Sequence, residues 1–484
     1  MTAKKADIAV IGLAVMGQNL ILNMNDHGVK VVAYNRTQIK VSDFIQGPAK
    51  NTDIQGASSL ENMVSLIESP RKILLMVRAG KVVDQYISQL VPLLSEGDVI
   101  IDGGNSDFID TERRVSELTK QGLHFIGMGV SGGEEGARFG PSIMPGGDVH
   151  AWPLVKDIFQ RIAARTENGD ICCDWVGSAG AGHFVKMVHN GIEYGDMQLI
   201  SESYHFMKTA LNMNHQEMHQ TFSAWNKTEL DSYLVEITAN ILAYEEEGKP
   251  LLENILDVAG QKGTGKLTGI NALEAGVPLT LISESVYARY LSGFKEERQQ
   301  AEVLFGKQVV PLSGDRTEWL EALRQSLLAA KVISYAQGFM LMKRISDERN
   351  WQLNYGNVAL MWRGGCIIRS TFLANISEAF QSNPDLVFLG MDEYFKNLLI
   401  RCTPAWRKIL SKTFEIGLPM PCTASGLSFF DAFTTGNLPA NLLQAQRDYF
   451  GAHTYERKDK PRGEFSHTDW TGKGGATASS TYNA

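Results

Sequence analysis

Hydrophobic and polar positions follow one pattern through the first third of the chain. Short apolar runs rich in β-branched residues alternate with amphipathic segments whose apolar positions recur at helical spacing. This alternation predicts parallel strand–helix–strand units, and therefore an α/β, doubly wound, Rossmann-type parallel sheet. The expected strands are residues 7–11, 30–34, 72–77, 98–101 and 124–128, with expected helices at 82–94 and 111–120 between them.

From about residue 176 the pattern changes, and long segments with helical periodicity dominate. The last residues are rich in Gly, Ser, Thr and Ala and cannot build a core alone, which is typical of a disordered tail. We expect a Rossmann-type domain over residues 1–178, a large all-helical domain over 179–438 and a C-terminal tail over 439–484. The expected long helices are 182–209, 231–247, 319–347 and 392–416.

Composition narrows the class of protein. A length of 484 residues suggests about three domains. The net charge of −8, without a dense basic run, argues against broad nucleic-acid binding. No apolar run is long enough for a membrane span, and the N-terminus lacks the features of a secretory signal. The five cysteines show no metal-ligand spacing, so we expect reduced thiols, a cytoplasmic protein and no metal site.

A glycine-rich turn follows the first expected strand and precedes a helical segment. Glycines at such a turn let backbone N–H groups approach a pyrophosphate, whose charge the helix N-terminus favours. Ala14 replaces the middle glycine of the dinucleotide-binding fingerprint, where its bulk moves the phosphate slightly outward without excluding it. The alternative is an ordinary turn whose glycines serve close packing. The expected cofactor contacts are Gly12, Leu13, Ala14, Val15, Met16 and Gly17.

The end of the second expected strand indicates which dinucleotide binds. An NAD site usually carries an acidic residue about 20 residues after the turn, where it accepts a hydrogen bond from the ribose 2′-OH. This chain has Asn35, Arg36 and Thr37 there. Arg36 offers a cationic fork for a 2′-phosphate, and no acid repels it. NADP is therefore the expected cofactor, and a solvated arginine is the alternative interpretation.

Three further loops follow expected strands. In an open α/β sheet, ligands bind beyond the carboxyl ends of the strands, so these loops should open onto one cleft. Their glycines allow close approach and their Asn and Ser side chains can bind hydroxyl groups, although the same residue types also form ordinary turns. The expected contacts are Val77, Arg78, Ala79 and Asn105 with the cofactor, and Asn105, Ser131, Gly132 and Gly133 with a substrate.

One helical segment carries a row of polar side chains. Lys186, His189, Asn190 and Glu193 occupy positions i, i+3, i+4 and i+7, which share one helix face, and Tyr194 follows. Lys186 and Glu193 lie about 10 Å apart along the axis, so their long side chains can reach the two ends of a small substrate. A solvated face is the alternative, but such faces are usually richer in Glu and Lys than in His and Asn.

These motifs resemble those of the 6-phosphogluconate dehydrogenase family. The segments that carry the likeness are GLAVMGQN, NRT, GGNS, SGGEEGAR, GPSIMPGG and FVKMVHNGIEYGD, in the family's order and spacing. The likeness covers essentially the whole chain, and Ala14 is also the family's residue. It implies NADP-dependent oxidative decarboxylation of 6-phosphogluconate to ribulose 5-phosphate in the pentose phosphate pathway.

The resemblance also implies roles for individual residues. Lys186 is expected to remove the proton from the C3 hydroxyl while hydride leaves C3, and then to polarise the resulting ketone. Glu193 is expected to protonate C1 after CO2 leaves. A base lysine requires a lowered pKa, and an acid glutamate requires a raised one.

Basic residues outside this helix are expected to anchor the substrate phosphate. Lys262 lies in a segment that nearly spells a P-loop, but Leu267 lacks the hydroxyl that would hold Mg²⁺, so we reject a nucleotide-triphosphatase. The resemblance implies that Lys262 and Arg289 contact the phosphate instead. It further implies that Arg447 and His453 of the tail complete the site of a neighbouring subunit, which would make the protein an obligate homodimer.

Two rival interpretations stay open at this point. Another β-hydroxyacid dehydrogenase, such as one acting on 3-hydroxyisobutyrate, would share the cofactor turn and the polar helix face, but would be shorter and lack the phosphate anchors and the tail. A catalytically silent NADP-binding protein would keep the fold, although loss of Lys186 or Glu193 would be expected, and both are present.

Overall fold

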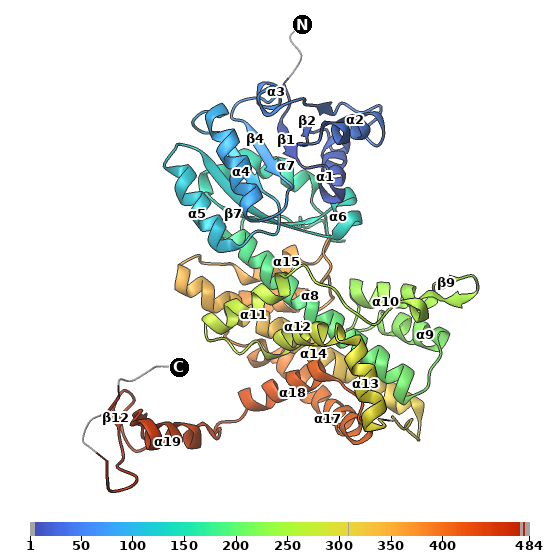
Figure 1. The fold of residues 1–484 in the computed structure, drawn as a ribbon, viewed down its shortest axis with the longest axis vertical. Coiled ribbons are helices and arrows are strands. Elements are labelled where there is room, and N and C mark those ends of the chain that lie inside the picture. The colour runs from blue at the N-terminus through green and yellow to red at the C-terminus, as the bar shows by residue number, and fades with distance from the viewer. Residues whose placement is uncertain (1–4, 308, 475–477, 480–484) are drawn as a thin grey trace. The chain divides into compact units, whose positions relative to one another are not determined.

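The computed structural model describes residues 5–307, 309–474 and 478–479. An eight-stranded sheet with the order β3-β2-β1-β4-β5-β6-β7-β8 forms the centre of the N-terminal part (Figure 1). The five strands expected from the sequence are all present, and each end lies within three residues of its expected position. The strands are β1 Ile8–Ile11, β2 Val31–Tyr34, β3 Gln55–Gly56, β4 Lys72–Leu75, β5 Val99–Asp102, β6 His124–Ser131, β7 Ser142–Gly147 and β8 Gly177–Ser178.

Strand β7 departs from the expected parallel sheet. It pairs antiparallel with β6, in a register that places Met128 opposite Pro145, whereas the other pairings in the sheet are parallel. Its sequence, Ser-Ile-Met-Pro-Gly-Gly, contains residue types that are rare within strands, so its hydrophobic pattern gave no strand signal. The expected parallel sheet therefore contains one antiparallel strand that the sequence did not indicate.

Helices cover both faces of the sheet. Ile8 and Val10 of β1 belong to one buried apolar cluster, and Ala9 and Ile11 belong to the other. Side chains of a strand alternate between its two faces, so the two clusters are the two sides of a doubly wound sheet. The helices are α1 Val15–Asp26, α2 Gln38–Gln46, α3 Leu60–Ser65, α4 Lys81–Leu90, α5 Phe108–Thr119, α6 Gly133–Phe139 and α7 Trp152–Ile162.

The following residues are mainly helical. Helix α8, Ala181–His205, packs against β6 and β7 on one side and against α11, α12 and α14 on the other, so the sheet and the helical part share it. The expected helix at 182–209 continues beyond α8 only as a single π-helical turn. The other helices are α9 His215–Trp225, α10 Tyr233–Ala243, α11 Thr264–Glu274, α12 Thr280–Ser292, α13 Lys295–Phe305, α14 Arg316–Arg349, α15 Tyr355–Met361, α16 Leu373–Ser382, α17 Glu393–Ile416 and α18 Pro421–Phe433.

One short hairpin interrupts this helical region. Strands β9, Glu245–Glu246, and β10, Lys249–Pro250, pair antiparallel. The expected helix at 231–247 therefore ends four residues early, at Ala243. Glu247 and Gly248 both have positive φ angles, and a left-handed pair of this kind forms a tight hairpin turn and cannot continue a helix.

The last residues form a separate compact unit, Leu427–Ala484. It contains α19, Ala440–Gly451, and a hairpin of β11, Tyr455–Glu456, and β12, Phe465–Ser466. The buried carboxylate of Asp448 accepts hydrogen bonds from the His467 ring, the Thr468 backbone and the Trp470 indole, which joins α19 to the chain after the hairpin. Residues 475–477 and 480–484 of the expected tail lie outside the described residues.

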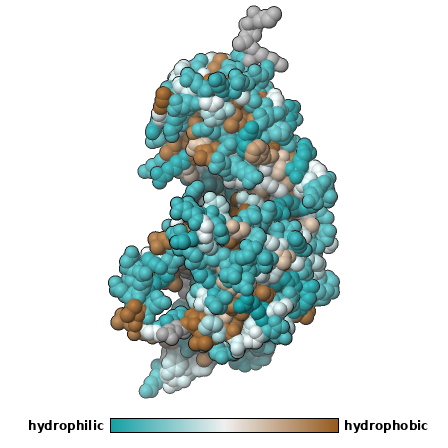
Figure 2. Space-filling model, turned by 90° about the vertical axis from the view of Figure 1, so that its right-hand side faces the viewer, coloured by the Kyte–Doolittle hydropathy of each residue, from teal (hydrophilic) through white to brown (hydrophobic). Residues whose placement is uncertain are grey.

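On the face drawn in Figure 2 hydrophilic residues predominate, with hydrophobic ones scattered among them. Of the helices in the described part of the chain, none combines the length and the apolar character that crossing a bilayer would require.

Candidate active site

The turn between β1 and α1 requires its first and last glycines. Gly12 has a φ of +112°, and a Cβ atom there would lie 2.3 Å from the carbonyl oxygen of Met76. A Cβ atom on Gly17 would lie 2.0 Å from the Gly12 carbonyl oxygen. Ala14 is the N-cap of α1 and makes no side-chain capping bond, so the backbone N–H groups of the first helical turn stay available to an anion.

The residues after β2 are fixed beside this turn. The side-chain oxygen of Asn35 accepts a hydrogen bond from the Leu13 backbone at 3.3 Å, which connects the two loops directly. Arg36 and Thr37 are exposed. Within the described part of the chain, Arg36 forms no ion pair, so its guanidinium is available for a phosphate at this edge.

The strand order brings the other expected loops to the same edge. Strands β1, β4, β5 and β6 are neighbours and run parallel, so the loops after them leave from one side of the sheet. These loops contain Val77, Arg78 and Ala79 after β4, Asn105 after β5, and Ser131, Gly132 and Gly133 at the end of β6.

Helix α8 lies unusually close to the sheet. A Cβ atom on Gly129 of β6 would lie 2.4 Å from the Cβ atom of Lys186, and one on Gly182 would lie 2.2 Å from the Gly127 carbonyl oxygen. A Cβ atom on Gly146 of β7 would lie 2.4 Å from the Gly182 nitrogen. Small residues on both sides therefore allow the polar face of α8 to sit beside the carboxyl end of β6.

His189 connects the expected residues of this face. Its Nδ1 lies 3.2 Å from Lys186 Nζ and 3.1 Å from the side-chain oxygen of Asn190. Its Nε2 lies 3.0 Å from Ser131 Oγ and 2.7 Å from Cys366 Sγ. Burial, with a smaller contribution from Lys186, holds the pKa of His189 well below its usual value, so the ring is neutral and relays hydrogen bonds.

The pKa values of the amine and the carboxyl group on this face move in opposite directions. Burial lowers the pKa of Lys186, against the opposing charge of Glu193. Burial also raises the pKa of Glu193, against the cations Lys186, Arg289 and Lys262. Because desolvation disfavours the charged form of both groups, the site favours a neutral amine and a neutral acid. This pairing suits proton transfer in both directions.

Cations lie beside the far end of the face. The Arg289 guanidinium stacks on the Tyr194 ring at 3.5 Å from its centroid, and it donates to the Gly260 carbonyl. Lys262 is exposed, just before α11, and its positive charge acts to lower the pKa of Glu193. The structure thus brings Lys262, Arg289 and Tyr194 together around Glu193.

Arg447 and His453 belong to the separate C-terminal unit. The Arg447 guanidinium donates to the side chain of Gln444 within α19. The His453 ring lies 3.3 Å from Ser479 Oγ, after the C-terminal end of the same helix.

Sequence reasoning missed several residues of the site. His183, on the α8 face that carries Lys186, binds the Asp102 carbonyl and Thr111 Oγ1 through its two ring nitrogens. Its position three residues before Lys186 was a signal that could have identified it. Cys366, which touches His189, lies 177 residues away from it in the chain, and no local pattern indicated it.

Comparisons with known proteins agree on one family. Residues 7–177 match the family model described as the NAD binding domain of 6-phosphogluconate dehydrogenase, and residues 182–470 match that of the 6-phosphogluconate dehydrogenase C-terminal domain. The chain belongs to the 6-phosphogluconate dehydrogenase family. The expected family resemblance and the expected two-part fold are therefore confirmed, apart from the orientation of β7.

Individual members of the 6-phosphogluconate dehydrogenase family are similar over their full lengths. A decarboxylating 6-phosphogluconate dehydrogenase of Haemophilus influenzae is 64% identical over 480 residues, which are 99% of both chains. The Homo sapiens enzyme of the same name is 60% identical over 99% of this chain and 100% of its own. The structure of Plasmodium falciparum 6-phosphogluconate dehydrogenase, described with NADP+ and with 6-phosphogluconate, has a TM-score of 0.92 at 43% identity, covering 96% of this chain and 100% of that one.

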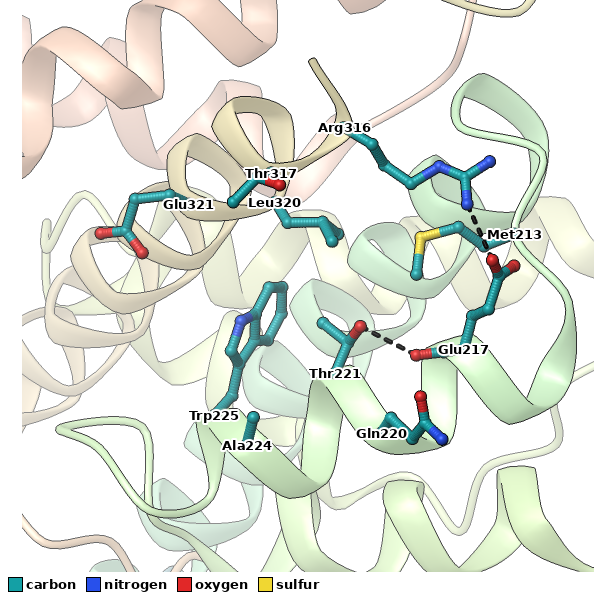
Figure 3. A pocket seen from close by; sticks show the side chains of 10 residues that line it. All are labelled: Met213, Glu217, Gln220, Thr221, Ala224, Trp225, Arg316, Thr317, Leu320 and Glu321. Carbon is teal, nitrogen blue, oxygen red and sulfur yellow. Dashed lines mark hydrogen bonds and ion pairs between the residues drawn. The ribbon is translucent and has the colours of Figure 1, made fainter.

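A surface pocket lies elsewhere, between α9 and the start of α14 (Figure 3). An ion pair of 2.8 Å between Arg316 and Glu217 lies at one side, and the Trp225 indole lies at another. None of the expected site residues lines this pocket, so we do not assign the catalytic site to it. Its lining residues are Met213, Glu217, Gln220, Thr221, Ala224, Trp225, Arg316, Thr317, Leu320 and Glu321.

Proposed function

We propose that this protein is an NADP-dependent, decarboxylating 6-phosphogluconate dehydrogenase. The observation that carries the proposal is the polar face of α8, on which Lys186 and Glu193 have pKa values shifted in opposite directions beside a dinucleotide-binding edge. Full-length similarity to enzymes of this name supports the substrate and the reaction. The alternative that this chain is a 3-hydroxyisobutyrate dehydrogenase is not favoured. The 6-phosphogluconate dehydrogenases that match it do so over its full length.

The proposed cofactor site fits NADP on three observations. The Gly12–Gly17 turn has no room for a Cβ atom at either glycine, so it joins β1 to the N-terminus of α1 in a tight turn. The N-terminus of α1 offers uncapped N–H groups. Arg36 is exposed at the end of β2, where a 2′-phosphate would lie. NADP, when bound here, supplies the acceptor for the hydride that leaves the substrate.

The residues of α8 account for the proton transfers. Lys186, whose pKa burial lowers, accepts the proton of the C3 hydroxyl as the C3 carbon is oxidised to a ketone. As an ammonium group it then donates a hydrogen bond to that ketone, which stabilises the negative charge that develops when the bond to CO2 breaks. Glu193, whose pKa burial raises, donates its proton to C1 of the resulting enediolate, which gives the ketose.

The remaining polar groups of the site bind the substrate. Ser131, His189 and Asn190 form a neutral chain of hydrogen bonds beside Lys186, suited to a sugar acid's hydroxyl and carboxylate groups. Gly132, Gly133 and Asn105 lie on loops at the same edge of the sheet, where we propose that they contact the sugar. Lys262 and Arg289, with Tyr194 supporting Arg289, supply positive charge for the phosphate at the far end.

We propose in addition that two copies of the chain associate and act in the cytoplasm. Helix α13 has no buried residue, although it contains Val303, Leu304 and Phe305, and Phe305 is 85% exposed. Large exposed apolar groups of this kind usually mark an interaction surface. Arg447 and His453 are proposed to reach the site of the second copy. Sedimentation velocity over a range of concentrations tests this, and a monomer at micromolar concentration would exclude the shared site.

The function is tested by mixing the purified chain with NADP and 6-phosphogluconate. Absorbance at the reduced-nicotinamide band should rise, and CO2 and ribulose 5-phosphate should appear in equal amounts with NADPH. Folded protein that forms no NADPH would favour a silent NADP-binding protein. NADPH formation without CO2 would indicate a dehydrogenase of a different class.

A further inference from the structure

The most completely bonded buried charge in the N-terminal part is Arg114 on α5. Its side chain is 1% exposed, and it takes no part in the proton transfers described above. We propose that Arg114 is a positioning residue for cofactor binding, because it fastens the loop after β4 to the loop after β5. This inference rests on the proposed NADP site.

Each N–H group of this guanidinium has an acceptor. Nε donates to Asp84 Oδ1 at 2.9 Å, and Nη2 donates to Asp84 Oδ2 and to the Gly80 carbonyl, both at 3.1 Å. Nη1 is directed at Asp102 Oδ2 at 3.4 Å and Ser106 Oγ at 3.5 Å. Five donors in one planar fork thus meet five acceptor contacts, an arrangement that a lysine with three donors on one atom cannot reproduce.

Two of the acceptors, Gly80 and Ser106, lie on the loops that border the proposed cofactor, whereas Asp84 lies in the first turn of α4 and Asp102 is the last residue of β5. Gly80 follows directly after Val77, Arg78 and Ala79, and it has a φ of +84° as the N-cap of α4. Ser106 follows directly after Asn105. The positions of these proposed cofactor contacts, on loops that leave neighbouring strands, are therefore set by one shared side chain.

The same network reaches the catalytic helix. The Asp102 carboxylate holds its own loop closed, because it accepts from Ser106 Oγ at 2.6 Å and from the Gly104 backbone at 3.0 Å. The Asp102 carbonyl oxygen lies 3.0 Å from Nε2 of His183, one turn before Lys186 on α8. Arg114 therefore helps to fix the position of the cofactor loops relative to Lys186. It does so without contacting the cofactor or the substrate.

The test compares NADPH binding, followed by nicotinamide fluorescence, in three variants of the full chain. Arg114→Lys keeps the charge and loses the fork, and it should raise the Kd for NADPH about ten- to a hundredfold, the effect of losing one or two charge-assisted hydrogen bonds. Ser106→Ala removes one contact and should raise the Kd by about three- to tenfold. Arg113→Lys is the matched control, because Arg113 also binds Asp84 but is 42% exposed and touches neither loop. It should bind NADPH as the unaltered chain does.

A structural defect alone would lower the folded fraction without changing the Kd of the folded protein, so each Kd is measured beside a thermal unfolding curve. In the double variant Arg114→Lys/Ser106→Ala, the increase in Kd should be smaller than the product of the single increases, because the two groups act on one loop. Unchanged NADPH affinity in both single variants would overturn the inference. If Arg114→Lys does not fold, an unchanged Kd for NADPH in Ser106→Ala is sufficient to overturn the inference. Failure of the unaltered chain to bind NADPH would instead overturn the proposed cofactor site.

Discussion

Replacing Gly129 with alanine should displace the base from the cofactor. The added Cβ atom would lie 2.4 Å from the Cβ atom and 3.0 Å from the Cγ atom of Lys186, on the helix that carries both proposed catalytic groups. Carbon atoms in contact are separated by about 3.5 Å or more, so relief of this overlap requires a movement of about 1 Å. The Gly182 carbonyl, at 3.2 Å, blocks one direction of escape. The movement therefore falls on α8 itself.

The expected cost has two parts. A displacement of about 1 Å at reacting groups lowers turnover by about a hundredfold. Overpacking between a strand and a helix also lowers the free energy of unfolding, by about 1–3 kcal/mol. Turnover should fall much more than the folded fraction does, because a protein of this size tolerates such a loss of stability and remains folded at room temperature.

The assay is kcat at saturating NADP and 6-phosphogluconate, together with the midpoint of urea unfolding. Gly28→Ala is a matched control. Gly28 has a φ of +76° with nothing within 4 Å of the added atom, so this change costs about 1–2 kcal/mol of backbone strain at a distance from α8. It should retain kcat. If Gly129→Ala kept full turnover with the same stability loss, close contact with β6 would not be what positions Lys186.

The other predictions concern the site directly. Lys186→Met should abolish turnover while NADPH fluorescence still reports binding, and retained turnover would remove Lys186 as the base. Arg36→Asp should shift the ratio of kcat/KM values from NADP towards NAD, because a carboxylate repels the 2′-phosphate and accepts from a 2′-hydroxyl; an unchanged ratio would assign recognition of the phosphate to another group. Because the lowered pKa of Lys186 belongs to a base that must lose its proton, activity should fall as pH decreases. The raised pKa of Glu193 belongs to an acid that must keep its proton, so activity should also fall as pH increases. Glu193→Gln should abolish the alkaline decline and lower kcat by about a hundred- to ten-thousandfold; a persistent alkaline decline would assign it to another group.

The sheet and its functional edge were predictable because their signals are local. The β-branched run at residues 98–101 identifies a buried strand without knowledge of its neighbours, and the structure has β5 there. Once the strands are known to be parallel, their carboxyl ends must meet at one edge, which places Arg36 and Asn105 on the same side of the sheet. Strand β7 was missed because Pro145 and its two following glycines remove the hydrophobic pattern on which strand prediction depends.

The inner part of the site could not be predicted in the same way. Cys366 reaches His189 only because the chain after α15 folds back onto α8, and no spacing in the sequence encodes that contact. Arg114 appears in the sequence as one of two adjacent arginines on an amphipathic helix. Whether it or Arg113 is buried depends on which face of α5 meets the sheet. Burial of charged groups is a tertiary property, and it decides their chemistry.

On helix α8, the presence or absence of a protein partner distinguishes the structural ionisable groups from the reactive ones. Asp196 is buried, but Lys331 of α14 pairs with it at 2.5 Å. Glu202 is also buried, and backbone N–H groups at the start of α18 bind it at 2.9 Å. In the part of the chain that the structure describes, Lys186 has no ionic partner, and the only ion-pair contact of Glu193 is with His189, whose ring is neutral. Burial raises the pKa of Asp196 and of Glu202, as it raises that of Glu193. The difference is that protein partners bind the first two carboxyl groups, whereas Lys186 and Glu193 are left for a ligand. The same low-polarity surroundings therefore produce both the base and the acid of the proposed reaction, with opposite pKa shifts from one physical cause.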